Sequence, residues 1–265
     1  MKNSFKKFFS NPAFAAAGFD YSSPLTTFLQ EPNSVYRDVL VRHYKNIFTS
    51  FGSDIEVPIY HGSLHAWAVL DAVRMLGTTI GMHDSLKDTA EYAAVFHDID
   101  YDVCVPDYVN TAQAVATALR FHHYNRENLP AIDTKVVSSA ILNTTFNKEL
   151  REFEFKDELD FSDPEREDVQ FSGFRCTAEE YYSQPYGTHV HWMLRDADLL
   201  GFIHPNWPDL LYSLAAELNM EGKTVEEIVR INCDFLKTCR MRTVKGKELM
   251  DKYIKTCEKV LNENN

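Results

Sequence analysis

Four side chains that can bind a metal ion occur in the order His, His-Asp, Asp, in three separate apolar segments. His65 lies in YHGSLHAWAVLDAVRML, His97-Asp98 ends TAEYAAVFHD, and Asp198 lies in HVHWMLRDADLLGF. An Asp at the C-terminal end of a helix opposes the helix dipole, and an unpaired buried carboxylate costs still more free energy. A divalent cation would compensate for both, and such ions accept imidazole and carboxylate ligands. The four residues therefore predict a metal site built from three buried helices.

Two nearby features compete with this assignment. A second His-Asp pair, His83-Asp84, occurs in GMHDSLKD, but Asp84 or Ser85 is well placed to cap the following helix, which is a complete structural explanation. Asp196 is the other candidate for the last ligand. Asp198 is bracketed by apolar residues, so its face of the helix is expected to point inward.

The ordered set resembles the HD-domain superfamily of metal-dependent phosphohydrolases, whose signature is H…HD…D on an all-helical scaffold. By this resemblance His65, His97, Asp98 and Asp198 are metal ligands, and Asp98 is also counted as catalytic. The segment YHGSLHA is similar to the Y-H-N-x-x-H-A motif of cyclic-nucleotide phosphodiesterases, in which the first His donates the leaving-group proton. The resemblance thus implies that His61 is the catalytic proton donor. The segment ADLLGFIHP is loosely similar to A-D-L-S-N-P of the same family, which favours Asp198 as the ligand.

The resemblance covers roughly residues 36–204 and has departures. Gly62 stands where the phosphodiesterases have Asn, and their purine-binding Gln has no assignable counterpart. We expect one divalent ion (Mn, Mg, Zn, Co, Ni or Fe), and a second remains open. A second ion would need further histidine ligands, for which the chain offers His122, His123, His189 and His191.

The resemblance implies hydrolysis of a phosphate ester or anhydride by a metal-activated water. The expected substrate is a nucleotide: a cyclic nucleotide, or a nucleoside mono- or triphosphate. Two alternatives stay open, a di-iron oxygenase on the same fold, which needs six protein ligands, and a non-catalytic module that binds a nucleotide. Arg195 could bind phosphate or lie on the surface, and Asp100 and Asp102 could orient the ligands or simply end the helix.

Helical periodicity dominates the segments that must position these residues. Residues 34–50 place apolar side chains, Val41 among them, on one stripe, with Ser34 as the N-cap. Residues 108–123 repeat small and apolar residues at Ala112, Val115, Ala116 and Leu119. The remaining helices are expected over 61–76, 86–97 (after a glycine-containing turn), 133–143 (capped by Asp133), 188–203, 207–219 and 224–262, the last as one or two helices.

Residues 151–187 have a different character. They are acidic and aromatic and are interrupted by Pro and Gly, so we predict an irregular insert, a loop or a lid, with a short hairpin in FEFKDELDF. Strand patterns are scarce elsewhere, and no linker divides the chain. The prediction is an all-α fold with a single HD-type domain over residues 1–265, a core at about 34–219 and C-terminal helices at 224–262.

The composition limits the classes of partner. The 265 residues carry a net charge of −12, so the chain has no excess Lys or Arg for general nucleic-acid binding. No segment approaches the roughly 18 apolar residues of a membrane span. The five cysteines form no C-x-x-C pair, and Asn11-Pro12 interrupts a weak signal-peptide-like start. We expect a cytoplasmic protein whose partner is a small nucleotide or other phosphate, with a homo-oligomer open.

Overall fold

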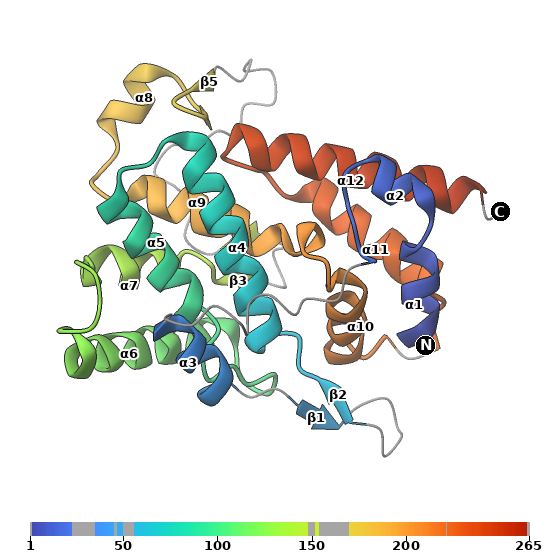
Figure 1. Cartoon of the computed structure of the whole chain (residues 1–265), viewed down its shortest axis with the longest axis horizontal. Coiled ribbons are helices and arrows are strands. Elements are labelled where there is room, and N and C mark those ends of the chain that lie inside the picture. The colour runs from blue at the N-terminus through green and yellow to red at the C-terminus, as the bar shows by residue number, and fades with distance from the viewer. Residues whose placement is uncertain are drawn as a thin grey trace.

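The protein is mostly helical in the computed structural model, which confirms the predicted all-α class (Figure 1). The structure describes residues 2–22, 35–44, 47–49, 56–147, 152–153, 170–220 and 222–263. In these ranges the strands form three two-stranded antiparallel pairs: β1 (Ile47–Thr49) with β2 (Glu56–Pro58), β3 (Phe146–Asn147) with β4 (Glu152–Phe153), and β5 (Gln170–Phe171) with β6 (Phe174–Arg175).

Two helices form the centre of the molecule. These are α4 (Ser63–Ile80) and α5 (Asp84–Phe96), which pack on each other and on α9 (Thr188–Leu199). On the far side of α5 lie α7 (Thr134–Leu142) and α6 (Asp107–Asn125). Because α4 and α5 are enclosed by neighbours, most of their side chains are buried, including small ones that let the helices approach closely.

A second group of helices covers the other side of α4. After a 3₁₀ turn, η2 (Gly201–Ile203), the chain forms α10 (Trp207–Glu217), α11 (Val225–Thr238) and α12 (Val244–Glu263), so the predicted segment 224–262 is two helices. The N-terminal helices α1 (Lys2–Phe9) and α2 (Pro12–Ala16) lie against α10 and α12, far from them in sequence (Figure 1). These two helices and the residues that follow them contribute five phenylalanines to the shared core: Phe5, Phe8, Phe9, Phe14 and Phe19.

The helix predicted over 34–50 is wrong in its second half. Helix α3 spans Val35–Arg42, and residues 47–49 form β1, paired with β2. Residues 47 and 48 are Ile and Phe, types that favour strands. Val41, expected on the buried stripe, is exposed, whereas its neighbour Leu40 is buried. The expected N-cap, Ser34, lies outside the described residues.

The buried face of α6 also differs from the prediction. Ala114 and Ala118 are fully buried, whereas Leu119 is 39% exposed and Ala112 and Ala116 are exposed. Small residues occur at i, i+4 spacing on both faces of α6, so hydrophobicity alone does not distinguish the buried face from the exposed one. The contact with α5 and α7 decides the orientation.

Residues next to the helix ends determine where the central helices begin and end. Helix α4 continues to Ile80, beyond the predicted 76, and ends at Gly81 with φ 71°, where the Met82 N–H donates to the carbonyl of Gly77 at 3.0 Å. The N-cap of α5 is His83, whose Nδ1 accepts from the backbone N–H of Ser85, so the capping residue predicted at 84 or 85 is wrong by one or two positions. The capping role inferred for this His-Asp pair is confirmed.

The C-terminal part of the insert is more regular than predicted. Residues 170–175 form a tight hairpin, and α8 (Ala178–Ser183) follows with a capping box between Thr177 and Glu180. Most of FEFKDELDF, the hairpin candidate, lies outside the described residues. Asp133 caps α7 as predicted, accepting from the N–H groups of Lys135 and Val136. None of the described helices combines the length and apolar character needed to cross a membrane.

Candidate metal centre and adjoining cavity

The three central helices bring the four predicted ligands together. His65 is in the first turn of α4, His97 and Asp98 directly follow α5, and Asp198 is in the last turn of α9. One ligand atom from each lies within 4.8 Å of the others. His65 Nε2 is 3.0 Å from Asp198 Oδ1 and 3.2 Å from Asp98 Oδ2, and His97 Nε2 is 2.9 Å from Asp98 Oδ2.

The chemistry of these atoms fits a cation. His97 Nδ1 donates to the carbonyl of Ala94 at 2.7 Å, so the imidazole, once its Nε2 proton is displaced by a cation, presents a lone pair at Nε2, which is 3.3 Å from His65 Nε2. Two imidazole nitrogens and two carboxylate oxygens therefore converge. The nitrogen–oxygen and nitrogen–nitrogen separations of 2.9–3.6 Å match those of adjacent ligands with bonds of about 2.1 Å. The group could hold a metal ion.

The electrostatics of the group point the same way. Burial opposes charge on His97, Asp98 and Asp198, but their mutual attraction outweighs it, and the neighbouring histidines hold the pKa of Asp98 well below its usual value. The carboxylates of Asp98 and Asp198 raise the pKa of His97 well above its usual value. Hydrogen bonds and charge from His65 and His97 lower the pKa of Asp198 to about 2, despite its burial. Both carboxylates are thus ionised at neutral pH, in a place where a divalent cation would satisfy them.

A carboxylate that sequence analysis missed lies beside His61. His61 Nδ1 donates to Glu217 Oε2 at 2.6 Å. Glu217, the last residue of α10, has a side chain that is only 5% exposed and also accepts the backbone N–H groups of Tyr60 and His61. The two partners are 156 positions apart, and Glu217 sits at the end of an amphipathic helix as an ordinary Glu would. No local sequence signal distinguishes it.

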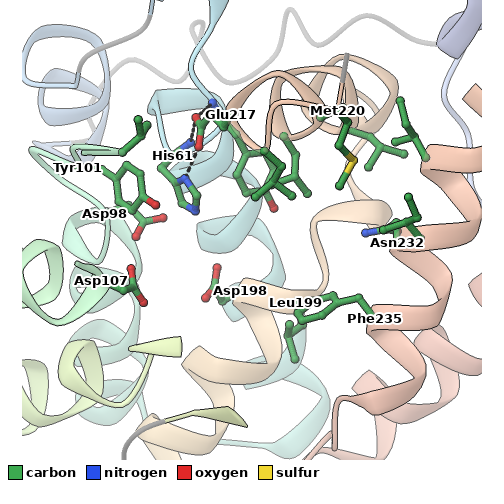
Figure 2. A pocket seen from close by; sticks show the side chains of 18 of the residues that line it. His61, Asp98, Tyr101, Asp107, Asp198, Leu199, Glu217, Met220, Asn232 and Phe235 are labelled. Carbon is green, nitrogen blue, oxygen red and sulfur yellow. Dashed lines mark hydrogen bonds and ion pairs between the residues drawn. The ribbon is translucent and has the colours of Figure 1, made fainter. Parts of the chain in front are cut away.

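The ring of His61 is held between these partners and the metal ligands. Tyr101 stacks on it at 3.8 Å between ring centroids. Its second ring nitrogen faces the space between Asp98 and Asp198 (Figure 2). Burial works to lower the pKa of His61, but the Glu217 hydrogen bond and the surrounding carboxylates outweigh it and raise the pKa. The imidazole can therefore carry a proton toward this space at neutral pH.

A cavity of about 330 Å³ extends from this point between the end of α9, α10 and α11. At the metal end its polar lining includes His61, Asp98, Asp107, Asp198 and Glu217; at the far end Leu199, Met220 and Phe235 form an apolar wall with Asn232 (Figure 2). Its size is within the roughly 300–1,000 Å³ of small-molecule sites. The candidate site therefore opens into a cavity with two chemically different ends.

The four further histidines considered for a second ion lie elsewhere. His191 contacts Ser139 and Asn143, and His189 stacks on Tyr181 at 3.9 Å. Rings of tyrosines lie next to the other two, His122 and His123. None joins the metal-binding group found among the described residues.

The remaining polar candidates also lie apart from the cavity. Arg195 is on α9 but is not among the described lining residues. Asp100 accepts from the Thr117 hydroxyl at 3.0 Å, and Asp102 accepts from the Cys104 N–H at 2.9 Å. These two carboxylates order the turn after α5, so the helix-ending interpretation is the one that their contacts support.

Asp196 has a structural role instead of joining the metal ligands. Its buried carboxylate accepts from the N–H groups of Arg242 and Thr243 and from the Thr243 hydroxyl at 2.5 Å, at the start of α12. Burial raises the pKa of Asp196 to about 6 against these hydrogen bonds. The RDAD segment thus ties α9 to α12 through its first Asp and presents the second to the metal group.

Gly246 makes this junction possible, which gives a stability prediction. A Cβ at this position would lie 2.6 Å from Thr243 Oγ1 and 2.9 Å from Asp196 Oδ2. We expect Gly246→Ala to lower the free energy of unfolding by about 2 kcal/mol, as overpacking does. Urea unfolding measures this change in the free energy of unfolding. The control is Gly77→Ala, because a Cβ at position 77 would meet its neighbours at an ordinary 3.5 Å or more. An unchanged midpoint for Gly246→Ala would contradict the described junction.

Comparison with known proteins finds no protein-family model, no curated protein and no solved structure that matches the chain. The geometry of the site is therefore the basis for assigning a function.

Proposed function

We propose that the chain is a metal-dependent phosphohydrolase of the HD type that cleaves a phosphate ester or anhydride of a nucleotide. One observation carries the proposal: the His65, His97, Asp98 and Asp198 ligand atoms converge beside the His61–Glu217 pair, at the end of a cavity. Metal ligands and a charged imidazole next to a ligand-sized space are what hydrolysis of a phosphoester by activated water requires.

The residues have separable roles in this proposal. A divalent ion held by the four ligands would lower the pKa of water from 15.7 towards about 7 and polarise a phosphoryl oxygen. His61 donates its Nε2 proton to the leaving oxygen. Glu217 stabilises the imidazolium and fixes its orientation through Nδ1, and Tyr101 holds the ring plane by stacking. Glu217 is thus a positioning residue.

Replacing Glu217 tests this positioning role. Glu217→Gln keeps the size of the side chain but removes its charge, so we expect kcat to fall roughly 10- to 100-fold while metal content stays unchanged. Activity that needs protonated His61 is lost as the pH rises through its pKa. Because Glu217 raises that pKa, the alkaline limb of the pH profile should move to lower pH in the variant. The control is Glu226→Gln, on the exposed side of α11; a limb that does not move would exclude the pairing.

A metal-supplemented activity screen tests the function itself. The purified protein is stripped of metal, supplied separately with Mn²⁺, Mg²⁺, Zn²⁺, Co²⁺ and Ni²⁺, and assayed against cyclic nucleotides, nucleoside mono- and triphosphates and ppGpp. Metal-dependent phosphoester or anhydride cleavage is the expected result. Iron in the aerobically purified protein with no hydrolysis would favour the oxygenase alternative, and tight nucleotide binding without turnover would favour a binding module.

A further inference from the structure

We infer that the substrate carries one phosphoryl group joined to a bulky apolar body, and that the cavity disfavours polyphosphates. This inference rests on the proposed function and names the substrate class for the same site. It would select a monophosphate or a cyclic phosphodiester over a nucleoside triphosphate. Two independent properties of the cavity carry it, the charge of its lining and the position of its apolar wall.

The charged groups lie at one end and are nearly all negative. Among the described residues that line the cavity there is no Lys or Arg, whereas four are carboxylates: Asp98, Asp107, Asp198 and Glu217. Among the described lining residues, His61 is therefore the cation that can meet a phosphoryl oxygen, and it lies beside the group that would hold the metal ion. One phosphoryl group can contact both. A second or third would bring its charge against carboxylates or apolar side chains, an unfavourable transfer in a partly enclosed site.

The opposite end offers apolar surface. Helices α10 and α11 contribute most of this wall, and Leu199 at the end of α9 continues it towards Asp198 (Figure 2). The larger apolar lining residues that the two helices and their connection provide are Leu211, Leu214, Leu218, Met220, Ile228, Ile231 and Phe235. A phosphate held at the metal end therefore directs its alcohol portion along apolar side chains, and burying that portion is favourable.

The first experiment varies the number of phosphoryl groups attached to the same nucleoside. The rate of AMP hydrolysis is compared with the rate of ADP hydrolysis. A metal buffer holds free Mn²⁺ constant in both assays, so that chelation by ADP does not remove the ion from the site. We expect kcat/KM for AMP to exceed that for ADP by about tenfold or more, as unmatched buried charge predicts. Equal or better use of ADP would overturn the inference and leave the proposed function standing.

The second experiment varies the body at constant charge. We expect 2-(1-naphthyl)ethyl phosphate, whose leaving alcohol is about as weakly acidic as ethanol, to exceed ethyl phosphate in kcat/KM by roughly 100-fold, the scale of burying an aromatic ring system. Ile231→Glu, at a wall position that is 37% exposed and so tolerant of charge, should reduce this preference about tenfold. The matched control is Leu119→Glu, 39% exposed on α6 and outside the described lining. Equal use of the two esters would overturn the inference.

Binding without metal gives a readout that does not depend on turnover. Fluorescence titration of the metal-free protein with 1-naphthol should show saturable binding that Ile231→Glu weakens and Leu119→Glu does not. No binding, or equal loss in both variants, would contradict the apolar wall as the binding surface. If all phosphate esters fail as substrates while 1-naphthol binds in this way, the proposed function fails and the apolar subsite stands.

Discussion

Asp198→Ala is expected to abolish both metal binding and phosphohydrolase activity. The substitution removes one of two carboxylates, and the remaining ligands would be His65, His97 and Asp98. Loss of a charged ligand weakens the site far more than the 10- to 100-fold seen for supporting residues, so we expect less than about 0.1 ion per chain after dialysis and activity at least about 1,000-fold lower. Elemental analysis and phosphate release measure the two effects.

Two further variants show whether misfolding, and not loss of a ligand, explains this result. Asp198→Asn keeps the shape of the side chain and should lose metal almost as completely. Asp100→Asn changes a carboxylate that contacts Thr117, outside the metal group, and should retain metal and activity. Full metal content and activity in both Asp198 variants would refute the assignment of this residue.

His61→Gln is expected to have the second largest effect, and a different one. If His61 supplies the proton for the leaving oxygen, kcat should fall about 100- to 10,000-fold, the usual contribution of general acid catalysis. Metal content should stay at the wild-type level, because His61 is not one of the four converging ligands. Esters with acidic alcohols such as p-nitrophenol should lose less activity than alkyl esters, since their leaving group needs no proton.

This substitution has a simple control. His123 lies beside Tyr124 near the end of α6, and His123→Gln should be silent. A His61→Gln variant that loses its metal, or loses equal activity on both kinds of ester, would show that His61 has another role.

The four candidate metal ligands could be recognised from sequence because each sits in a strongly apolar helical context, where an unpaired His or Asp is costly. The structure brings all four predicted residues into one group that could hold an ion, and it places Asp198 in this group while Asp196 contacts the start of α12. The choice of Asp198 over Asp196 depended on resemblance as well as on periodicity, because both residues are on α9 and both are largely buried. Only the contact of Asp196 with the start of α12 shows why two carboxylates are needed.

The features that could not be predicted depend on tertiary contacts. Glu217 reaches His61 across 156 positions, and its helix gives no sign of this contact. The orientation of α6 was mistaken because small residues occupy more than one of its faces. The helix predicted over 34–50 is wrong at residues 47–49 because these residues pair with β2, a tertiary contact that helical periodicity does not reveal. The cavity wall, likewise, exists only once α10 and α11 pack beside α9.

A metal titration of the stripped protein tests the central claim most directly. Mn²⁺ is added stepwise to protein at a concentration well above the dissociation constant of the protein–Mn²⁺ complex, and phosphoester hydrolysis is measured after each addition. We expect no hydrolysis before Mn²⁺ is added, then a linear rise and a plateau at one equivalent per chain. Hydrolysis that persists in the stripped protein, or that needs two equivalents to reach its plateau, would contradict a single ion held by His65, His97, Asp98 and Asp198.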